Sequence, residues 1–166
     1  EPEPLSGTLR VQTSNVPRAL AAHPSYVQDA AAALVTRYAA IPRHARVADV
    51  CAAPGGKALA MARSARYVLA ADPSAPRLEL VRQNARRLGL PVGVVRARAE
   101  HTPAVDMDAV LVDAPCTGTG TLRRHPDARW RLQARDPAQM AEVQARILLG
   151  AADAVRPGGL LVYSTC

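Results

Sequence analysis

Short apolar segments alternate with segments of helical spacing along this chain, and that alternation restricts the fold more than any other feature. Strands that alternate with helices are joined by right-handed crossovers into a parallel sheet. We therefore predict an α/β fold, a doubly wound and mainly parallel sheet that is truncated after its fifth strand. The predicted strands span residues 46–51, 67–71, 91–96, 109–112 and 160–164, and the predicted helices span residues 26–40, 57–63, 75–88 and 136 to about 155.

Proline and glycine set several of these boundaries. Pro42 ends the first helix, because proline lacks the N–H that a continuing helix needs. Gly89 ends the third helix, where glycine accepts a left-handed conformation at low cost. Asp136 followed by Pro137 predicts an N-cap and a first helical residue, and residues 157–159 predict the turn into the fifth strand.

The chain is long enough for one domain with a substantial core. Residues 1–25 are rich in proline, serine and threonine and lack helical spacing, so we interpret them as a linker or the remnant of an upstream module. Residues 26–166 form the predicted domain. Phenylalanine is absent and alanine is abundant, which suits helices packed closely on a sheet.

The formal net charge of the chain is +7. A positive charge favours a polyanionic partner, because each phosphate that a protein neutralises releases counterions. An arginine-rich composition across the whole genome explains the charge equally well. Charge alone therefore leaves the partner open.

The three cysteines lack Cys-x-x-Cys spacing, which argues against a structural zinc site and against a disulfide framework. We therefore predict reduced thiols and no bound metal. No apolar run approaches the ~20 residues that span a bilayer, and no signal-peptide pattern opens the chain. The protein is expected to be cytoplasmic and monomeric, with no membrane partner.

A loop of small residues follows the first predicted strand, and Asp72 follows the second. The loop, residues 51–56, makes a tight turn into a helix, so its backbone N–H groups can approach a carboxylate, hydroxyl or phosphate of a ligand. Asp72 can accept hydrogen bonds from the two ribose hydroxyls of an adenosine cofactor. The alternative is an ordinary strand–helix turn with an N-capping aspartate.

Two cysteines follow the fourth and fifth predicted strands, Cys116 in Asp113-Ala114-Pro115-Cys116 and Cys166 in Tyr163-Ser164-Thr165-Cys166. If those strands are neighbours, roughly 4.8 Å apart, both thiols reach the same crevice beside Asp113. Lys57 and nearby arginines would lower the pKa of a nucleophilic thiol. The alternatives are buried thiols, the role we assign to Cys51, or a redox disulfide, which the cytosol disfavours.

A basic segment lies between the fourth strand and the last helix, with four arginines, one histidine and the only tryptophan within residues 123–131. This composition suits contact with a nucleic-acid backbone. Alternatively, Arg124 pairs locally with Asp127. Trp130 is expected to pack beneath the loop rather than to stack on a base.

Three stretches of this chain resemble the bacterial ribosomal RNA cytosine-C5 methyltransferases of the Sun/Fmu type. They are DVCAAPGGK at Asp49–Lys57, DAPCTGTGTLRRHPDARW at Asp113–Trp130, and PGGLLVYSTC at Pro157–Cys166. Tyr26-Val27-Gln28-Asp29 is similar to the start of the family's catalytic domain. The resemblance implies a Rossmann-like class I methyltransferase fold, and the RRHPD sequence narrows it to enzymes that act on small-subunit rRNA.

The resemblance also implies S-adenosylmethionine as the cofactor and RNA as the partner. The implied cofactor-binding residues are Cys51, Ala52, Ala53, Pro54, Gly55, Gly56, Lys57, Asp72, Arg77, Asp113 and Pro115. Cys166 would attack cytosine C6, Cys116 would be needed for product release, and Asp113 would contact the base while Lys57 orders the polar cluster. The implied RNA-binding residues are Arg123, Arg124, His125 and Arg129.

This chemistry agrees with what cytosine requires. Addition of a thiolate at C6 makes C5 nucleophilic enough to accept a methyl group, and the base must leave its stack to enter the site. Three alternatives remain open: a binding module without turnover, methylation of tRNA, and a redox or metal-binding role for the thiols. The sequence does not name the methylated cytosine.

Overall fold

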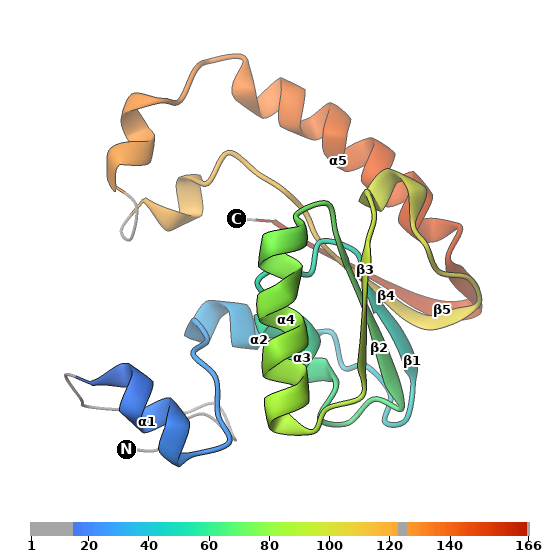
Figure 1. Ribbon diagram of the computed structural model, residues 1–166. Coiled ribbons are helices and arrows are strands. Elements are labelled where there is room, and N and C mark those ends of the chain that lie inside the picture. Colours follow the sequence, from blue (N-terminus) through green and yellow to red (C-terminus); the bar gives the residue numbers. More distant parts are fainter. Residues whose placement is uncertain (1–14, 123–125, 166) are drawn as a thin grey trace.

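Five parallel strands form the centre of the molecule in the computed structural model, which describes residues 15–122 and 126–165. Their order is β3-β2-β1-β4-β5 (Figure 1). The strands are β1 Arg46–Asp49, β2 Tyr67–Asp72, β3 Val92–Arg96, β4 Met107–Asp113 and β5 Val155–Ser164. The predicted doubly wound parallel sheet is confirmed, and the order reverses direction between β1 and β4, where such sheets bind ligands.

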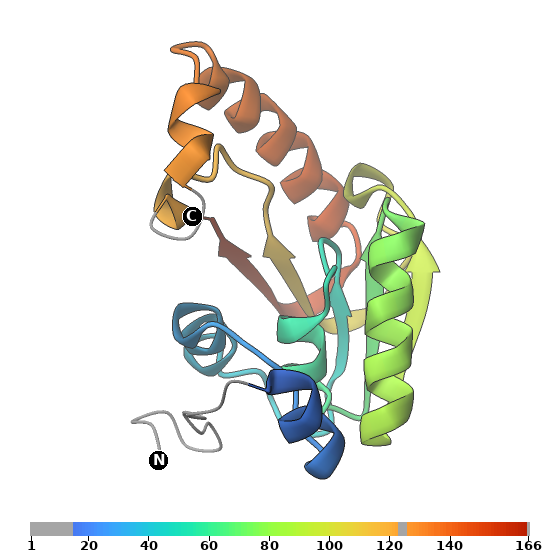
Figure 2. The ribbon, with the colours of Figure 1, turned by 60° about the vertical axis from the view of Figure 1, so that its left-hand side comes forward.

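Helices cover both faces of this sheet (Figures 1 and 2). The α-helices are α1 Val16–Ala22, α2 Ala30–Tyr38, α3 Gly56–Met61, α4 Ala75–Leu88 and α5 Asp136–Ala152. Short 3₁₀ turns are η1 Ala99–His101, η2 Thr119–Thr121 and η3 Pro126–Trp130. On one face α3 and α4 pack with Val47 and Leu111, and on the other α5 packs with Val110 and Val112.

Small side chains let these layers approach closely. Ala58 on α3, Ala70 on β2 and Ala109 on β4 are fully buried. Gly150 on α5 also permits close packing. A Cβ at this position would lie 2.4 Å from the carbonyl oxygen of Glu100 and would clash with it. The core therefore has the alanine-based helix-on-sheet packing that the composition predicted.

The amino-terminal segment differs from the prediction. Residues 15–25 were expected to lack helix, but Val16–Ala22 is helical, with the Asn15 side chain accepting a hydrogen bond from the N–H of Arg18 at 3.0 Å. The next helix begins at Ala30 rather than at residue 26, because the Asp29 side chain caps its first turn. Residues 26–29 therefore stay extended and are available to line a pocket.

The last helix and strand also differ at their starts. Asp136 was predicted as the N-cap of α5, but the cap is Arg135, and the Asp136 carboxylate accepts from the N–H of Gln133 at 2.8 Å. Strand β5 begins at Val155, so residues 157–159 lie within the strand rather than precede it. The pairing jumps from Met107↔Val155 to Ala109↔Leu160. This irregularity places Gly158 at φ 74°, a conformation that glycine adopts readily.

Candidate active site

The loop between β1 and α3 forms one wall of the site. Gly55 is the N-cap of α3 at φ 108°, and a Cβ there would lie 3.0 Å from Val81 Cγ2 on α4. Glycine is therefore needed for both the conformation and the space. The turn brings the loop and the first N–H groups of α3 to the carboxyl ends of β1 and β4, as the sequence predicted.

Two predicted cofactor residues, Asp72 and Arg77, form hydrogen bonds to the backbone of this loop. Asp72 at the end of β2 accepts a hydrogen bond from the N–H of Ala53 at 3.2 Å and another from the N–H of Ser74 at 2.9 Å. Arg77 on α4 donates to the carbonyl oxygen of Ala53. Asp72 and Arg77 therefore hold the N–H and the carbonyl oxygen of Ala53 in place. Neither residue lines the pocket described below.

A polar cluster joins the ends of three segments. The Lys57 ammonium lies 2.5 Å from Asp113 Oδ2, and the Ser164 hydroxyl donates to Asp113 Oδ1 at 2.7 Å. Lys57 comes from the start of α3, Asp113 from the end of β4 and Ser164 from the end of β5. The sequence singled out Lys57 and Asp113, but it did not identify Ser164, which holds the second oxygen of the aspartate.

Asp49 is a further carboxylate that the sequence analysis did not single out. It ends β1, is 1% exposed, and has no hydrogen-bond partner on either carboxylate oxygen among the described residues. Burial raises the pKa of Asp49 to about 7, with a further contribution from the charge of Asp113, while Lys57 and the N–H of Cys51 oppose the shift. Its position directly before the small-residue loop was the available signal.

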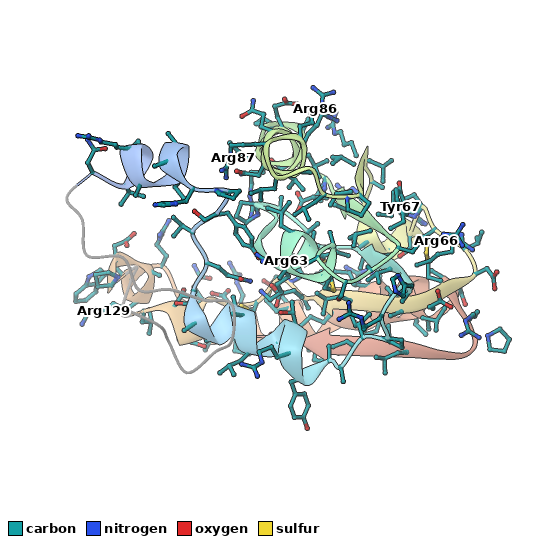
Figure 3. The ribbon with its side chains drawn as sticks, turned by 90° about the horizontal axis from the view of Figure 1, so that it is seen from below. Arg63, Arg66, Tyr67, Arg86, Arg87 and Arg129 are labelled. Atoms are coloured by element: carbon teal, nitrogen blue, oxygen red, sulfur yellow. The ribbon has the colours of Figure 1, made fainter. Side chains whose placement is uncertain are left out.

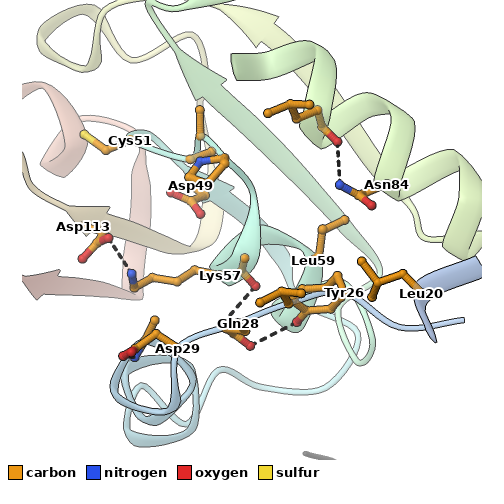
Figure 4. Close-up of a pocket in the computed structure, with 17 residues that line it drawn as sticks. Leu20, Tyr26, Gln28, Asp29, Asp49, Cys51, Lys57, Leu59, Asn84 and Asp113 are labelled. Atoms are coloured by element: carbon orange, nitrogen blue, oxygen red, sulfur yellow. Dashed lines mark hydrogen bonds and ion pairs between the residues drawn. The ribbon is translucent and has the colours of Figure 1, made fainter. Parts of the chain in front are cut away.

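A pocket of about 370 Å³ opens between these groups and the amino-terminal segment (Figure 4). Pockets of this size suit a small organic ligand. The loop, the polar cluster and Asp49 line one side, and apolar side chains of α1, α3 and α4 contribute Leu20, Leu59 and Leu80. The predicted cofactor residues in the lining are Cys51, Ala52, Ala53, Pro54, Gly56, Lys57 and Asp113.

Residues 26–29 close the pocket from the side opposite the loop (Figure 4). The Gln28 amide donates to the carbonyl oxygen of Gly56 at 3.1 Å, and the Tyr26 hydroxyl donates to Gln28 Oε1 at 3.3 Å. Burial raises the pKa of Tyr26, so its hydroxyl stays protonated as a donor. The sequence identified this segment only as the start of the domain and missed its contact with the loop.

The carboxyl ends of β4 and β5 are tied together beyond the sheet. The Gln144 amide on α5 donates to the carbonyl oxygen of Pro115 at 2.8 Å and to Thr165 Oγ1 at 3.4 Å. The Tyr163 hydroxyl donates to Gln144 Oε1 at 2.9 Å. The residues that precede the two candidate thiols are therefore neighbours, as predicted from adjacent strands. Cys166 itself lies outside the described residues, and Pro115 is not part of the pocket lining.

The thiols differ in state from the prediction. Cys116 is disulfide-bonded in the structure, so the expectation of reduced thiols is wrong for this residue. Spacing along the sequence could not exclude a bond that depends on which segments the fold brings together. Cys51 is free, and burial followed by the charge of Asp49 raises its pKa to about 12. A thiol with that pKa stays protonated, which fits the packing role assigned to Cys51.

The basic segment is exposed where the structure describes it. Trp130 is 82% exposed, so the prediction that it packs beneath the loop is wrong, and the Arg129 guanidinium lies 5.7 Å from the centre of its ring. Asp127 pairs with Arg131 at 2.7 Å. The predicted RNA contacts Arg123, Arg124 and His125 lie outside the described residues, and so does the alternative pairing of Arg124.

The family model of the 16S rRNA methyltransferase RsmB/F matches residues 39–166, which include the loop, the polar cluster and both strand ends. The chain belongs to this family. The resemblance that the sequence motifs carried is thereby confirmed.

Individual relatives of the family agree with this assignment. Ribosomal RNA small subunit methyltransferase B of Klebsiella pneumoniae is 41% identical over 147 residues, which are 84% of this chain and 34% of that protein. The crystal structure of PH0851 matches with a TM-score of 0.79 at 33% identity, over 85% of this chain and 34% of that one.

A second solved structure, NSun6 from Pyrococcus horikoshii with SFG, matches with a TM-score of 0.73 at 31% identity, over 85% of this chain and 38% of that one. The chain therefore spans about a third of the length of these relatives.

Within residues 15–122 and 126–165, no group of three or more histidine, cysteine, aspartate or glutamate side chains is placed to hold a metal ion. Over the same part of the chain, no helix is long and apolar enough to cross a membrane.

Proposed function

We propose that this chain transfers a methyl group from S-adenosylmethionine to C5 of a cytosine in RNA, and that the RNA is small-subunit rRNA in the cytoplasm. The family description and the printed name of the Klebsiella pneumoniae relative support the rRNA target. The main support for this proposal is the geometry of the site. The loop after β1, the Lys57–Asp113–Ser164 cluster and the joined ends of β4 and β5 meet at one edge of the sheet.

The pocket has the features that the cofactor would need. The adenosine and amino-acid portions are polar at their ends and apolar between, and the lining combines the loop backbone with Leu59 and Leu80. Residues 51–57 would hold the amino-acid portion, and Asp72 would reach the ribose from the end of β2. Arg77 would act by fixing Ala53. When bound, S-adenosylmethionine supplies an electrophilic methyl group on its sulfonium.

The proposed reaction assigns one task to each remaining group. The Cys166 thiolate forms a bond to C6 of the cytosine, and the electron density that this bond delivers makes C5 nucleophilic toward the methyl group. The C5 proton then passes to solvent, its electron pair re-forms the C5–C6 double bond, and the S–C6 bond breaks to return Cys166 as a thiolate, with Cys116 assisting release. Asp113 contacts the base at N3 and the exocyclic amine, held in place by Lys57 and Ser164.

Exposed positive charge would bind the RNA. Arg129 and Trp130 lie on η3, next in the chain to the predicted contacts at 123–125. Figure 3 also labels three exposed arginines away from Arg129, which are Arg63 after α3, Arg66 before β2 and Arg86 near the end of α4. Arg87 differs from these, because it donates to the carbonyl oxygens of Leu20 and Ser25.

The test is transfer of labelled methyl from S-adenosylmethionine to ribosomal RNA purified from cells that lack the gene, in the presence of a reductant that keeps Cys116 as a thiol. Cys166→Ser should abolish transfer. Cys116→Ala should accumulate a covalent RNA–protein adduct, and the double variant should lose that adduct because the nucleophile is gone. Unchanged turnover in Cys166→Ser would refute the assigned nucleophile.

The disulfide at Cys116 favours one second candidate, a module that binds cofactor and RNA without turnover. Calorimetry separates the two functions. Cofactor binding without methylation of rRNA or tRNA under reducing conditions would favour the binding module, and methylation of tRNA alone would change the substrate but keep the chemistry.

A further inference from the structure

Residues 26–29 line the pocket, although they come before the stretch of the chain that the family model matches. They run extended between α1 and α2, and Tyr26 and Gln28 are half-buried while Val27 is 70% exposed. The proposed methyl transfer gives this segment no task. The hydrogen bonds of its half-buried side chains indicate what it holds in place.

Both ends of this segment are attached to neighbouring helices. The Arg87 guanidinium on α4 donates to the carbonyl oxygen of Ser25 at 2.6 Å. At the other end, the Asp29 side chain accepts from the N–H of Ala31 in the first turn of α2 at 2.9 Å. The Gln28 side chain therefore extends from a backbone that is held on both sides.

Gln28 joins that segment to the small-residue loop. Its Nε2 donates to the carbonyl oxygen of Gly56 at 3.1 Å, and its Oε1 accepts from the Tyr26 hydroxyl at 3.3 Å (Figure 4). A flipped amide would place its oxygen against the Gly56 carbonyl oxygen, so one orientation of the amide is favoured. The Gln28 side chain also lies 3.6 Å from the position that a Cβ on Gly56 would take, so it packs closely on that glycine.

The contact at Gly56 lies next to the polar cluster. Gly56 is the first residue of α3 and directly precedes Lys57, whose ammonium lies 2.5 Å from Asp113 Oδ2. The loop is also held at Ala53, by hydrogen bonds from the end of β2 and from α4. Gln28 therefore adds a second fixed point to the loop, beside the backbone from which the Lys57 side chain extends.

We propose that Gln28 is a positioning residue for methyl transfer, which holds the start of α3 so that the Lys57 ammonium stays against Asp113. Tyr26 contributes by orienting the Gln28 amide. The inference rests on the proposed function, in which Asp113 contacts the cytosine. Without the Gln28 contact the loop keeps its attachment at Ala53, so the cofactor still binds while the base loses alignment. Alignment of the reacting groups governs the rate of the chemical step.

The experiment measures kcat for methyl transfer to ribosomal RNA under reducing conditions, and the Kd of S-adenosylhomocysteine by calorimetry. Gln28→Ala should lower kcat about tenfold, the scale of one hydrogen bond, and change that Kd by less than about twofold. Gln28→Glu keeps the shape of the side chain but turns a carboxylate oxygen toward the Gly56 carbonyl, so it should lose at least as much. A role in packing alone would leave Gln28→Glu close to wild type. Tyr26→Phe should lower kcat about threefold and add nothing in the Gln28→Ala background.

Gln83 on α4 provides the matched control, because it is an exposed glutamine whose amide donates to Glu79 at 3.3 Å and it does not line the pocket. Gln83→Ala should keep the wild-type kcat. Hydrogen exchange of the backbone N–H groups of residues 59–61 in α3 is a second readout, which needs no activity. This exchange should become at least about fivefold faster in Gln28→Ala and stay unchanged in Gln83→Ala.

The outcomes separate this inference from the proposed function. A kcat within about twofold of wild type in Gln28→Ala, or a loss of cofactor affinity at unchanged kcat, would refute the positioning role. Unchanged hydrogen exchange in α3 would refute it as well. Failure of the wild-type protein to methylate any RNA would refute the proposed function, and the exchange measurement would still decide whether Gln28 holds the start of α3. If Gln28→Ala folds poorly, Gln28→Glu and Tyr26→Phe carry the same test.

Discussion

Replacing Asp49 by asparagine should stabilise the unliganded protein at pH 8, although it removes a buried native side chain. Burial raises the pKa of Asp49 from 3.8 in an unperturbed chain to about 7 in the folded protein. Between those two values the folded state holds a proton that the unfolded state has lost. Stability of the wild-type protein therefore falls as pH rises through that window, and asparagine removes the titration.

The magnitude follows from the size of the shift. Each unit of pKa difference corresponds to about 1.4 kcal/mol, so a shift from 3.8 to about 7 destabilises the ionised folded state by at most about 4 kcal/mol above pH 7. At pH 5 the folded carboxyl is still protonated and about 2.5 kcal/mol of this penalty has yet to develop. The asparagine amide meets the same shortage of partners, at about 1–3 kcal/mol, but at every pH.

Urea denaturation of wild type and Asp49→Asn at pH 5 and pH 8, without ligand, measures this directly. The difference in free energy of unfolding between the two proteins should move in favour of the variant by about 2.5 kcal/mol on going from pH 5 to pH 8. A difference that stays constant with pH would mean that Asp49 is ionised and satisfied in the folded state. That result would remove the physical basis for an unpaired carboxylate.

Three further substitutions test other parts of the site. Lys57→Met should lower kcat/KM for methyl transfer about a hundredfold, because one charged partner of Asp113 is lost. Gly55→Ala should destabilise by about 2–3 kcal/mol in urea titrations, because φ is 108° and the new Cβ meets Val81. Gly89→Ala is its control: φ is 64° with no atom within 4 Å of the new Cβ, so about 1 kcal/mol is expected, and equal losses would contradict the steric argument. Trp130→Ala should leave stability within about 0.5 kcal/mol, since the ring is 82% exposed, and should weaken RNA binding in a filter assay by about 1–3 kcal/mol. Unchanged RNA affinity would remove Trp130 from the interface.

The strands and most helices could be predicted because their signals are local. Helix α4 was predicted at its observed bounds, since Gly89 supplies the left-handed residue at φ 64° that ends it. Helix α1 was missed because seven residues give too little periodicity, and its signals are Asn15 and Pro17 at its first turn. The start of β5 was missed because pairing with Met107 in β4 extends the strand past a glycine pair.

The site was predictable only where one segment carries the whole signal. The loop at 51–56 and the Asp113-Ala114-Pro115-Cys116 segment are such motifs. Ser164 and Gln28 act through partners 51 and 28 residues away in sequence, so nothing near them marks their roles. The exposure of Trp130 was also not readable from sequence, because tryptophan packs in most proteins and the tertiary surroundings decide.

The position of Lys57 explains why Asp113 is paired with a cation and Asp49, at the end of the neighbouring strand, is not. Asp49 ends β1 and pairs in register with Leu111, so Asp113 lies two residues farther along β4, at the point where the start of α3 presents Lys57. Lys57 and Ser164 satisfy both oxygens of Asp113, which is thereby held in one orientation. The same pairing leaves Asp49 buried beneath the loop near the charge of Asp113, so its pKa is raised although Lys57 and the N–H of Cys51 oppose the shift. The sheet's switch point therefore presents two carboxylates from adjacent strands, one paired with a lysine and one buried.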